Sequence, residues 1–157
     1  MVGLSADVTS AAGGDVYGCA VKTDGTVLCW GNNRSSMFGF SGLGTYPTPR
    51  VVPKVRNDAR TITAGFSHTC IITSSGGAQC WGRNGSGQLG NGRALPEDAP
   101  SDVIGINEKI TSLALGGNHT CALLESGTVK CFGSASVGEL GTGTKVYSPV
   151  PVTVNLD

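Results

Sequence analysis

The sequence predicts an all-β protein made of three tandem repeats, each an antiparallel unit of four short strands. Three observations lead to this fold class: the cysteines recur at a constant interval, glycines and aromatic residues keep the same register, and a hairpin pattern lies inside each cysteine pair. The 157 residues include 25 glycines, with 39% hydrophobic and 14% charged residues. This composition is too rich in glycine for a helical domain and too apolar for a disordered chain.

The cysteines define the repeat length. They form two series with an interval of 51 residues, Cys19, Cys70, Cys121 and Cys29, Cys80, Cys131. Other residues hold the same phase, for example Gly25, Gly76, Gly127 and Trp30, Trp81, Phe132. Similarity at a fixed period is the signature of repeat architectures. We therefore expect a single repeat array over residues 1–157, divided approximately into 8–58, 59–109 and 110–157.

Each cysteine pair lies within a predicted β-hairpin. In the first repeat, two β-prone runs flank a turn at 23–25, and its glycine suits a three-residue loop closed by a bulge. This turn pairs Lys22 with Thr26, and counting outward places Cys19 opposite Cys29. Facing residues in a non-hydrogen-bonded antiparallel pair lie close enough for a disulfide. The register predicts three bridges, Cys19–Cys29, Cys70–Cys80 and Cys121–Cys131.

A metal site is the alternative use of the cysteines. Zinc sites need short chelating spacings such as Cys-x2-Cys, which are absent from the sequence. We therefore expect no metal and no cofactor. Because paired cysteines persist in oxidising compartments, we expect a secreted, periplasmic or cell-surface protein. The first seven residues lack the basic and apolar regions of a secretory signal, and the apolar runs are too short to span a bilayer.

The rest of each repeat completes a four-stranded unit. After the hairpin of the second repeat come a glycine-dense loop at 81–92, a proline-containing extended stretch and a further strand over 109–115. Four-stranded units of this size are arranged around a central axis as β-propeller blades. Because closed propellers have at least about four blades, three repeats predict an incomplete ring unless chains associate.

The motif of the second repeat resembles a known family. The segments Gly65-x-x-His68-Thr-Cys and Cys80-Trp-Gly-x-Asn-x-x-Gly-Gln-Leu-Gly90 resemble the regulator of chromosome condensation repeat, in a bacterial, disulfide-containing form related to β-lactamase inhibitor protein II. The third repeat keeps His119 but has Phe132 in place of tryptophan, and the first has Tyr17 where the others have histidine. The resemblance implies blades of a seven-bladed propeller, so three repeats depart from the family pattern.

The resemblance also implies a protein-binding module rather than an enzyme. His68 and His119 recur at a structural phase, and neither a nucleophile nor a carboxylate recurs with them, so we expect no enzymatic activity. With 11 basic and 11 acidic residues the net charge is zero, and we expect no binding to nucleic acid or to a membrane surface. The nucleotide exchange and chromatin binding of the eukaryotic branch are disfavoured by the disulfides and this charge. The bacterial branch offers inhibition of a β-lactamase as an alternative, for which no contact residues are carried over.

Positions that vary at a fixed phase are the candidates for partner binding. We predict a binding rim from equivalent loops, formed by Asp15, Val16, Phe66, Ser67, Gly117 and Asn118. Phe66 is the leading residue, because an exposed aromatic side chain costs solubility unless it contacts a partner; packing against the next blade is the alternative. Phe40 and Tyr46, in the irregular stretch 38–46, form a second candidate surface.

Self-association is the alternative function. Two copies would supply six blades, so a homodimer could complete a ring, whereas contacts that fail to close would form a fibre. A third possibility is that the chain is part of a longer propeller. The sequence leaves these open and does not identify a partner.

Overall fold

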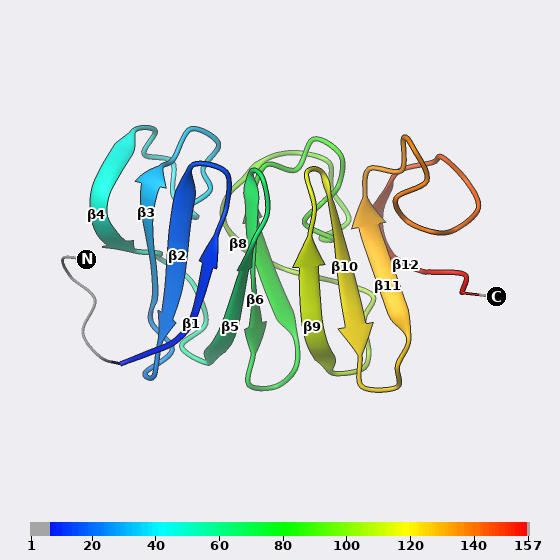
Figure 1. The fold of residues 1–157 in the computed structure, drawn as a ribbon, viewed down its shortest axis with the longest axis horizontal. Coiled ribbons are helices and arrows are strands. Elements are labelled where there is room, and N and C mark those ends of the chain that lie inside the picture. Colours follow the sequence, from blue (N-terminus) through cyan, green and yellow to red (C-terminus); the bar gives the residue numbers. More distant parts are fainter. Residues whose placement is uncertain (1–6, 157) are drawn as a thin grey trace.

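The computed structural model describes residues 7–156 and shows three four-stranded antiparallel sheets, with no helix in that range (Figure 1). The first sheet contains β1 (Val8–Gly13), β2 (Tyr17–Lys22), β3 (Val27–Asn32) and β4 (Thr45–Val51). The second contains β5 (Ala59–Ala64), β6 (His68–Thr73), β7 (Ala78–Gly82) and β8 (Glu97–Asp102). The third contains β9 (Ile110–Leu115), β10 (His119–Leu124), β11 (Val129–Gly133) and β12 (Ser148–Thr153). The predicted fold class is confirmed, and each sheet is one blade.

The predicted hairpin geometry positions the disulfides. Lys22 N donates to Thr26 O at 2.9 Å and Gly25, at φ +81°, donates from its N to Lys22 O at 3.0 Å. Only a glycine adopts this left-handed conformation without steric cost, and it sets the register that pairs Cys19 with Cys29. The same pairing recurs in the other blades, and three disulfides join cysteines whose Cα atoms lie 4.1–4.2 Å apart.

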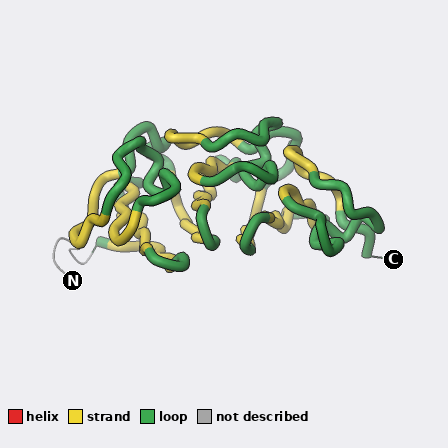
Figure 2. Tube along the Cα trace, turned by 90° about the horizontal axis from the view of Figure 1, so that it is seen from above, coloured by secondary structure: helices red, strands yellow, loops and turns green. Residues whose placement is uncertain are grey.

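The blades form an open arc. Seen from above, β1, β5 and β9 lie on the concave side, and β4, β8 and β12 lie on the convex side (Figure 2). The convex strands contain Pro47 and Pro49, Pro100, and Pro149 and Pro151. Proline cannot donate to a ladder and is therefore tolerated on edge strands, where it also discourages pairing with another chain.

The hydrophobic core lies between neighbouring blades. Trp81 is fully buried and its indole Nε1 donates to Met37 O of the first blade at 2.8 Å. Phe132, at the same phase in the third blade, is fully buried beside Gly90 of the second. Trp30 is only half-buried, against Gly18 of its own blade. Trp81 and Phe132 therefore fill the space between their own blade and the preceding one.

The third blade has one uncovered face. Every residue of β6 is buried, because blades cover both of its faces. In β10 the burial alternates: Thr120, Ala122 and Leu124 face the second blade and are buried, whereas Leu123 is 41% exposed. His119 and Cys121, on the same face as Leu123, are half-buried. Residues 7–156 therefore form an incomplete ring.

Candidate partner-binding rim

All loops that join β1–β2 and β3–β4, and their equivalents in the other blades, lie at the same end of the strands, the upper end in Figure 1. We call this end the loop rim and define it as residues 14–16, 33–44, 65–67, 83–96, 116–118 and 134–147. The tight hairpin turns lie at the opposite end. The fold therefore gathers the variable loops of three blades on one surface.

Buried asparagines hold the long loops of the rim in place. In the first blade, Asn33 Oδ1 accepts from Phe38 N at 2.9 Å, and Asn33 Nδ2 donates to Gly42 O at 2.7 Å. Asn84 repeats this in the second blade, accepting from Leu89 N at 3.0 Å. These side chains satisfy backbone groups that a loop would otherwise leave unpaired. The rim therefore stands on a fixed base.

The predicted rim residues occupy the short loops, and most of them are exposed. Phe66 is 50% exposed and Val16 is 38% exposed. Asp15, Gly117 and Asn118 are exposed as well, and Asp15 forms an ion pair with Arg34 at 2.9 Å. Ser67 differs, since it is only 3% exposed and contributes its carbonyl oxygen, which accepts from Arg83 N at 2.9 Å.

The second predicted surface is an aromatic cluster. Phe40 and Tyr46 are partly buried and pack on the fully buried Phe38, with ring centroids 5.9 Å and 5.7 Å from that ring. Tyr46 Oη donates to Gly42 O at 3.0 Å. These contacts fold the loop over the core, and a partner role for Phe40 and Tyr46 stays a prediction.

Further exposed apolar residues on the rim were not predicted from the sequence. They lie in the long loops and comprise Leu43, Leu95, Val137, Val146 and Tyr147. Leu43 and Val137 are single apolar residues between glycine and polar residues, whereas Val146 and Tyr147 are adjacent, so the sequence carries no common signal for them. Their position on the same end as Phe66 appears only once the blades are assembled. The apolar surface of the rim is therefore broader than the sequence suggested.

Two grooves open on the rim between adjacent blades. The groove between the first and second blades has a volume of about 320 Å³ and is lined by Arg34, Ser35, Ser36, Leu43, Arg83 and Pro96. The groove between the second and third blades has a volume of about 280 Å³ and includes Gly85, Ser86, Ser134, Ser136, Lys145 and Tyr147. Each is large enough for a single side chain of a partner.

His68 joins the second blade to the third. Thr120 Oγ1 donates to Gln88 O at 2.9 Å, so it can only accept from His68 Nε2, which lies 2.8 Å away. The ring is fully buried and its Nδ1 has no hydrogen-bond partner in the described part of the chain. Burial, and to a lesser extent the nearby His119, lowers the pKa of His68 to about 4. His68 is therefore a neutral packing residue at neutral pH.

Tyr17 occupies the same position between the first and second blades. Its Oη lies 2.8 Å from His68 O and 2.9 Å from Thr69 Oγ1. Burial raises the pKa of the Tyr17 phenol far above its usual value. The position shared by Tyr17 and His68 is therefore one of packing between blades, filled by a tyrosine in the first blade and a histidine in the second. His119, at the same phase, lies half-buried on the uncovered face of the third blade.

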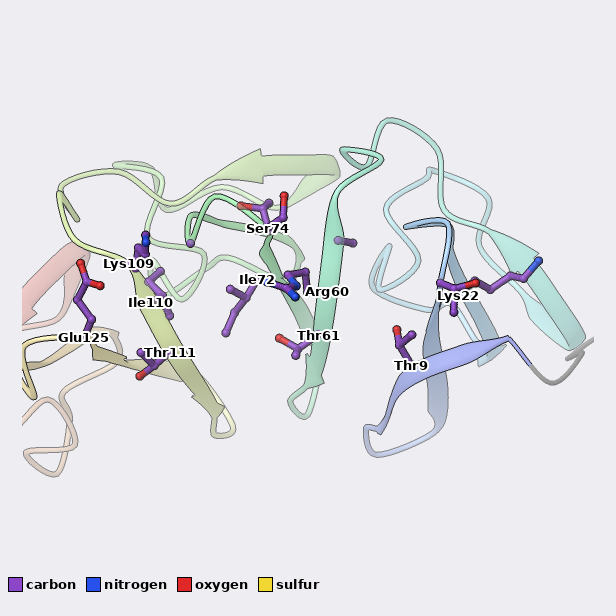
Figure 3. A pocket seen from close by; sticks show the side chains of 14 residues that line it. Thr9, Lys22, Arg60, Thr61, Ile72, Ser74, Lys109, Ile110, Thr111 and Glu125 are labelled. Carbon is purple, nitrogen blue, oxygen red and sulfur yellow. The ribbon is translucent and has the colours of Figure 1, made fainter.

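A wider pocket of about 670 Å³ lies at the end of the strands opposite the loop rim, near the innermost strands (Figure 3). Arg60 lies at its centre, and Lys22, Lys109 and Glu125 also line it. The Lys22 side chain extends away from Arg60 and its ammonium lies 4.0 Å from Asp24. Because these charges do not converge on one point, we assign no ligand to this pocket.

Within residues 7–156, no group of three His, Cys, Asp or Glu side chains is placed to hold a metal ion. The same range contains no helix that is long and apolar enough to cross a membrane. The absence of a cofactor stays a prediction.

Comparison with known proteins identifies the repeat. The regulator of chromosome condensation (RCC1) repeat matches residues 8–36, 59–88 and 110–139, and a second description of the same repeat matches 75–123. Human protein RCC2 is 41% identical over 102 residues, which cover 61% of this chain and 20% of that protein. The human probable E3 ubiquitin-protein ligase HERC3 is 32% identical over 150 residues, covering 92% of this chain and 14% of the ligase.

The fold matches solved propellers as well. Prp20p of Saccharomyces cerevisiae superimposes with a TM-score of 0.86 and 22% identity, covering all of this chain (100%) and 41% of the yeast protein. At this identity the likeness concerns the fold alone. The chain thus spans between 14% and 20% of the two curated relatives and less than half of the solved structure.

Proposed function

The chain belongs to the regulator of chromosome condensation (RCC1) repeat family, and from this premise we propose that it is a protein-binding β-propeller module that recognises its partner through the loop rim. We propose further that these repeats have no catalytic activity of their own. The ligase named among the relatives offers no argument for activity here, because the match covers only 14% of that protein.

The exposed Phe66 carries this proposal. It is 50% exposed at the tip of a three-residue loop on a rigid blade, in a chain with only four phenylalanines. Exposed aromatic and aliphatic side chains gathered on one surface mark interaction sites in soluble proteins. Val16 in the equivalent loop and Leu43 and Leu95 in the long loops add apolar area on the same end.

The fold neighbour supports a protein as the class of partner. Prp20p of S. cerevisiae has binding properties toward Gsp1p and histones. Those partners are not carried over, because the chain covers 41% of Prp20p at 22% identity. The three disulfides support a location in an oxidising compartment, secreted, periplasmic or on a cell surface.

Self-association is a second candidate function, favoured by the uncovered face of β10. In a homodimer with six blades, this face would meet the first blade of a second copy. That blade has Gly18 at the phase of Thr69 and Thr120. His119 would therefore have no threonine hydroxyl as a hydrogen-bond partner. Lys22 would lie at the phase of the buried Leu124. We therefore expect such a dimer to be weak; light scattering on the eluting protein measures its mass, and a stable dimer would favour self-association.

Selection from a displayed peptide library tests the proposal. The bait is the disulfide-intact chain, and each selected peptide is located on it by changes in backbone amide NMR shifts. We expect the changes to cluster at 14–16, 65–67 and 116–118. Peptides that instead perturb the hairpin turns at 22–26 and 73–77, or no binders at all, would contradict recognition by the rim.

A further inference from the structure

We propose that the groove between the first and second blades binds an acidic side chain of the protein partner. This inference rests on the proposed function, because it names the chemistry that the rim recognises. The groove takes one carboxylate, which anchors a segment whose apolar residues contact Phe66 and Val16.

Two arginines from different blades line the groove. Arg34 follows β3, and its backbone N donates to Asn32 Oδ1 at 2.9 Å. Arg83 follows β7, and its backbone N donates to Ser67 O at 2.9 Å. Both backbones are thus tied to the rigid base of the rim while both side chains remain exposed. A guanidinium presents a planar fork of donors that matches a carboxylate.

The positive charge of the groove is only partly compensated. Arg34 Nη2 pairs with Asp15 Oδ2 at 2.9 Å. Arg83 forms no ion pair with any carboxylate in the described range 7–156, and no acidic residue lines the groove. One guanidinium is therefore left for an incoming acid.

The repeat shows that blade packing does not require these arginines. In the groove between the second and third blades, Gly85 stands at the phase of Arg34 and Ser134 at the phase of Arg83. Both grooves form between blades of the same architecture. The second groove is lined by one cation, Lys145, and by no arginine. The two arginines therefore add guanidinium groups to the first groove without a structural need, which points to recognition.

Ser36 is a second, independent departure from the repeat. It lines the groove at φ +53°, whereas the same phase holds Gly87 at φ +78° and Gly138 at φ +88°. A serine in this left-handed conformation is strained where glycine is not. Its hydroxyl makes no hydrogen bond to any residue of the described part. A strained serine that keeps a hydroxyl at the groove fits a donor for the same carboxylate.

The remaining walls favour a carboxylate on an aliphatic stem over a free inorganic anion. Leu43 and Pro96 are exposed and apolar, and they line the groove together with Ser35 and Ser36. The volume of about 320 Å³ suits one side chain. Glutamate offers both the methylenes for these walls and the carboxylate for the arginines.

NMR titration of the disulfide-intact chain tests the proposal, with N-acetyl-glutamic acid methylamide as the probe. We expect saturable shifts of the Ser35 and Ser36 amides and of the Arg83 side-chain Nε–H signal, with affinity in the millimolar range. The glutamine analogue should leave them unchanged. R83S, which installs the residue of the third blade, should weaken binding at least about fivefold. R60T removes an equal charge at the end of the strands opposite the loop rim and installs the residue of the other two blades. It should leave binding unchanged.

A gain-of-function variant keeps the test independent of any loss of folding. Gly85 has open space around its Cβ position and no left-handed φ, so G85R/S134R can place two arginines at the second groove. We expect this variant to bind two equivalents of the probe. The proposal is overturned if glutamate and glutamine analogues shift the same signals equally, if inorganic phosphate shifts them and glutamate does not, or if G85R/S134R gains nothing. Peptides that still bind around Phe66 would then leave the proposed function standing.

Discussion

His68 in the second blade donates a 2.8 Å hydrogen bond from Nε2 to Oγ1 of Thr120 in the third blade, and Thr120 donates to Gln88 O behind it. One repeat earlier, Tyr17 meets Thr69 at 2.9 Å, and Thr69 Oγ1 donates to Met37 O at 3.2 Å. Both interfaces between blades therefore contain the same contact, a hydrogen bond between an aromatic ring substituent or ring nitrogen of one blade and a threonine hydroxyl of the next.

The burial of the His68 ring makes stability depend on pH. The pKa of His68 is about 4 in the folded protein against 6.5 in an unfolded chain, so the unfolded state binds the proton more tightly. The free energy of unfolding has its full value above about pH 6.5. It falls by about 3 kcal/mol as the pH drops from 6.5 to 4. Urea unfolding at pH 7, 5.5 and 4 measures this loss.

The variant H68Y provides the control, because tyrosine fills the same position in the first blade. It should remain folded and lose most of the pH dependence between 6.5 and 4, since a phenol stays neutral there. An H68Y profile as steep as that of the native chain would place the responsible proton elsewhere.

Removing the hydroxyl of Thr120 should weaken the joint between the second and third blades. T120V keeps the shape but leaves both His68 Nε2–H and Gln88 O without a partner, and an unsatisfied buried polar group costs about 1 to 3 kcal/mol. T120S keeps the hydroxyl and should lose less. Chemical denaturation compares the two, and a loss in T120S with none in T120V would mean that the methyl group matters rather than the hydrogen bond.

Each disulfide should contribute about 2 to 3 kcal/mol, because its sequence separation of 10 closes a short loop in the unfolded chain. C70A/C80A should lose more than C121A/C131A, since Cys70 and Cys80 are fully buried whereas Cys121 is half-buried. Thermal unfolding of both variants measures the difference. An unchanged melting temperature after full reduction would refute a stabilising role.

Gly90 marks a point where blades approach closely. Its φ is +66°, and a Cβ built there would lie 2.7 Å from the Phe132 ring. G90A should therefore lose about 1 to 3 kcal/mol from strain and overpacking. The matched variant G117A, at an open position, should change the free energy of unfolding by less than about 0.5 kcal/mol in the destabilising direction. Similar losses in both would exclude close approach as the cause.

The repeat and the hairpins were predictable, because the 51-residue interval and the turn at Gly25 are local signals that set the register of Cys19 and Cys29. The recurrence of His68 was also visible in the sequence, but its partner Thr120 was not, since that contact depends on how two blades pack. The repeat phase alone therefore predicted a structural role for His68 but not the atoms that it contacts.

The groove with Arg34 and Arg83 could not be predicted for the same reason. These residues are far apart in the sequence and are brought to one groove by the contact between two blades. Similarly, Phe40 and Tyr46 looked like an exposed irregular surface, but the loop folds back so that both pack on Phe38. Side-chain packing within a long loop leaves little trace in a single sequence.

The affinity of a rim-selected peptide for two matched variants tests the central claim most directly. F66S removes the exposed aromatic side chain of the rim, and V51S removes an exposed apolar side chain from β4 on the convex side. Recognition by the loop rim predicts that F66S weakens binding at least about tenfold and that V51S leaves it unchanged, as measured by calorimetry. Unchanged affinity in F66S together with a loss in V51S would contradict it.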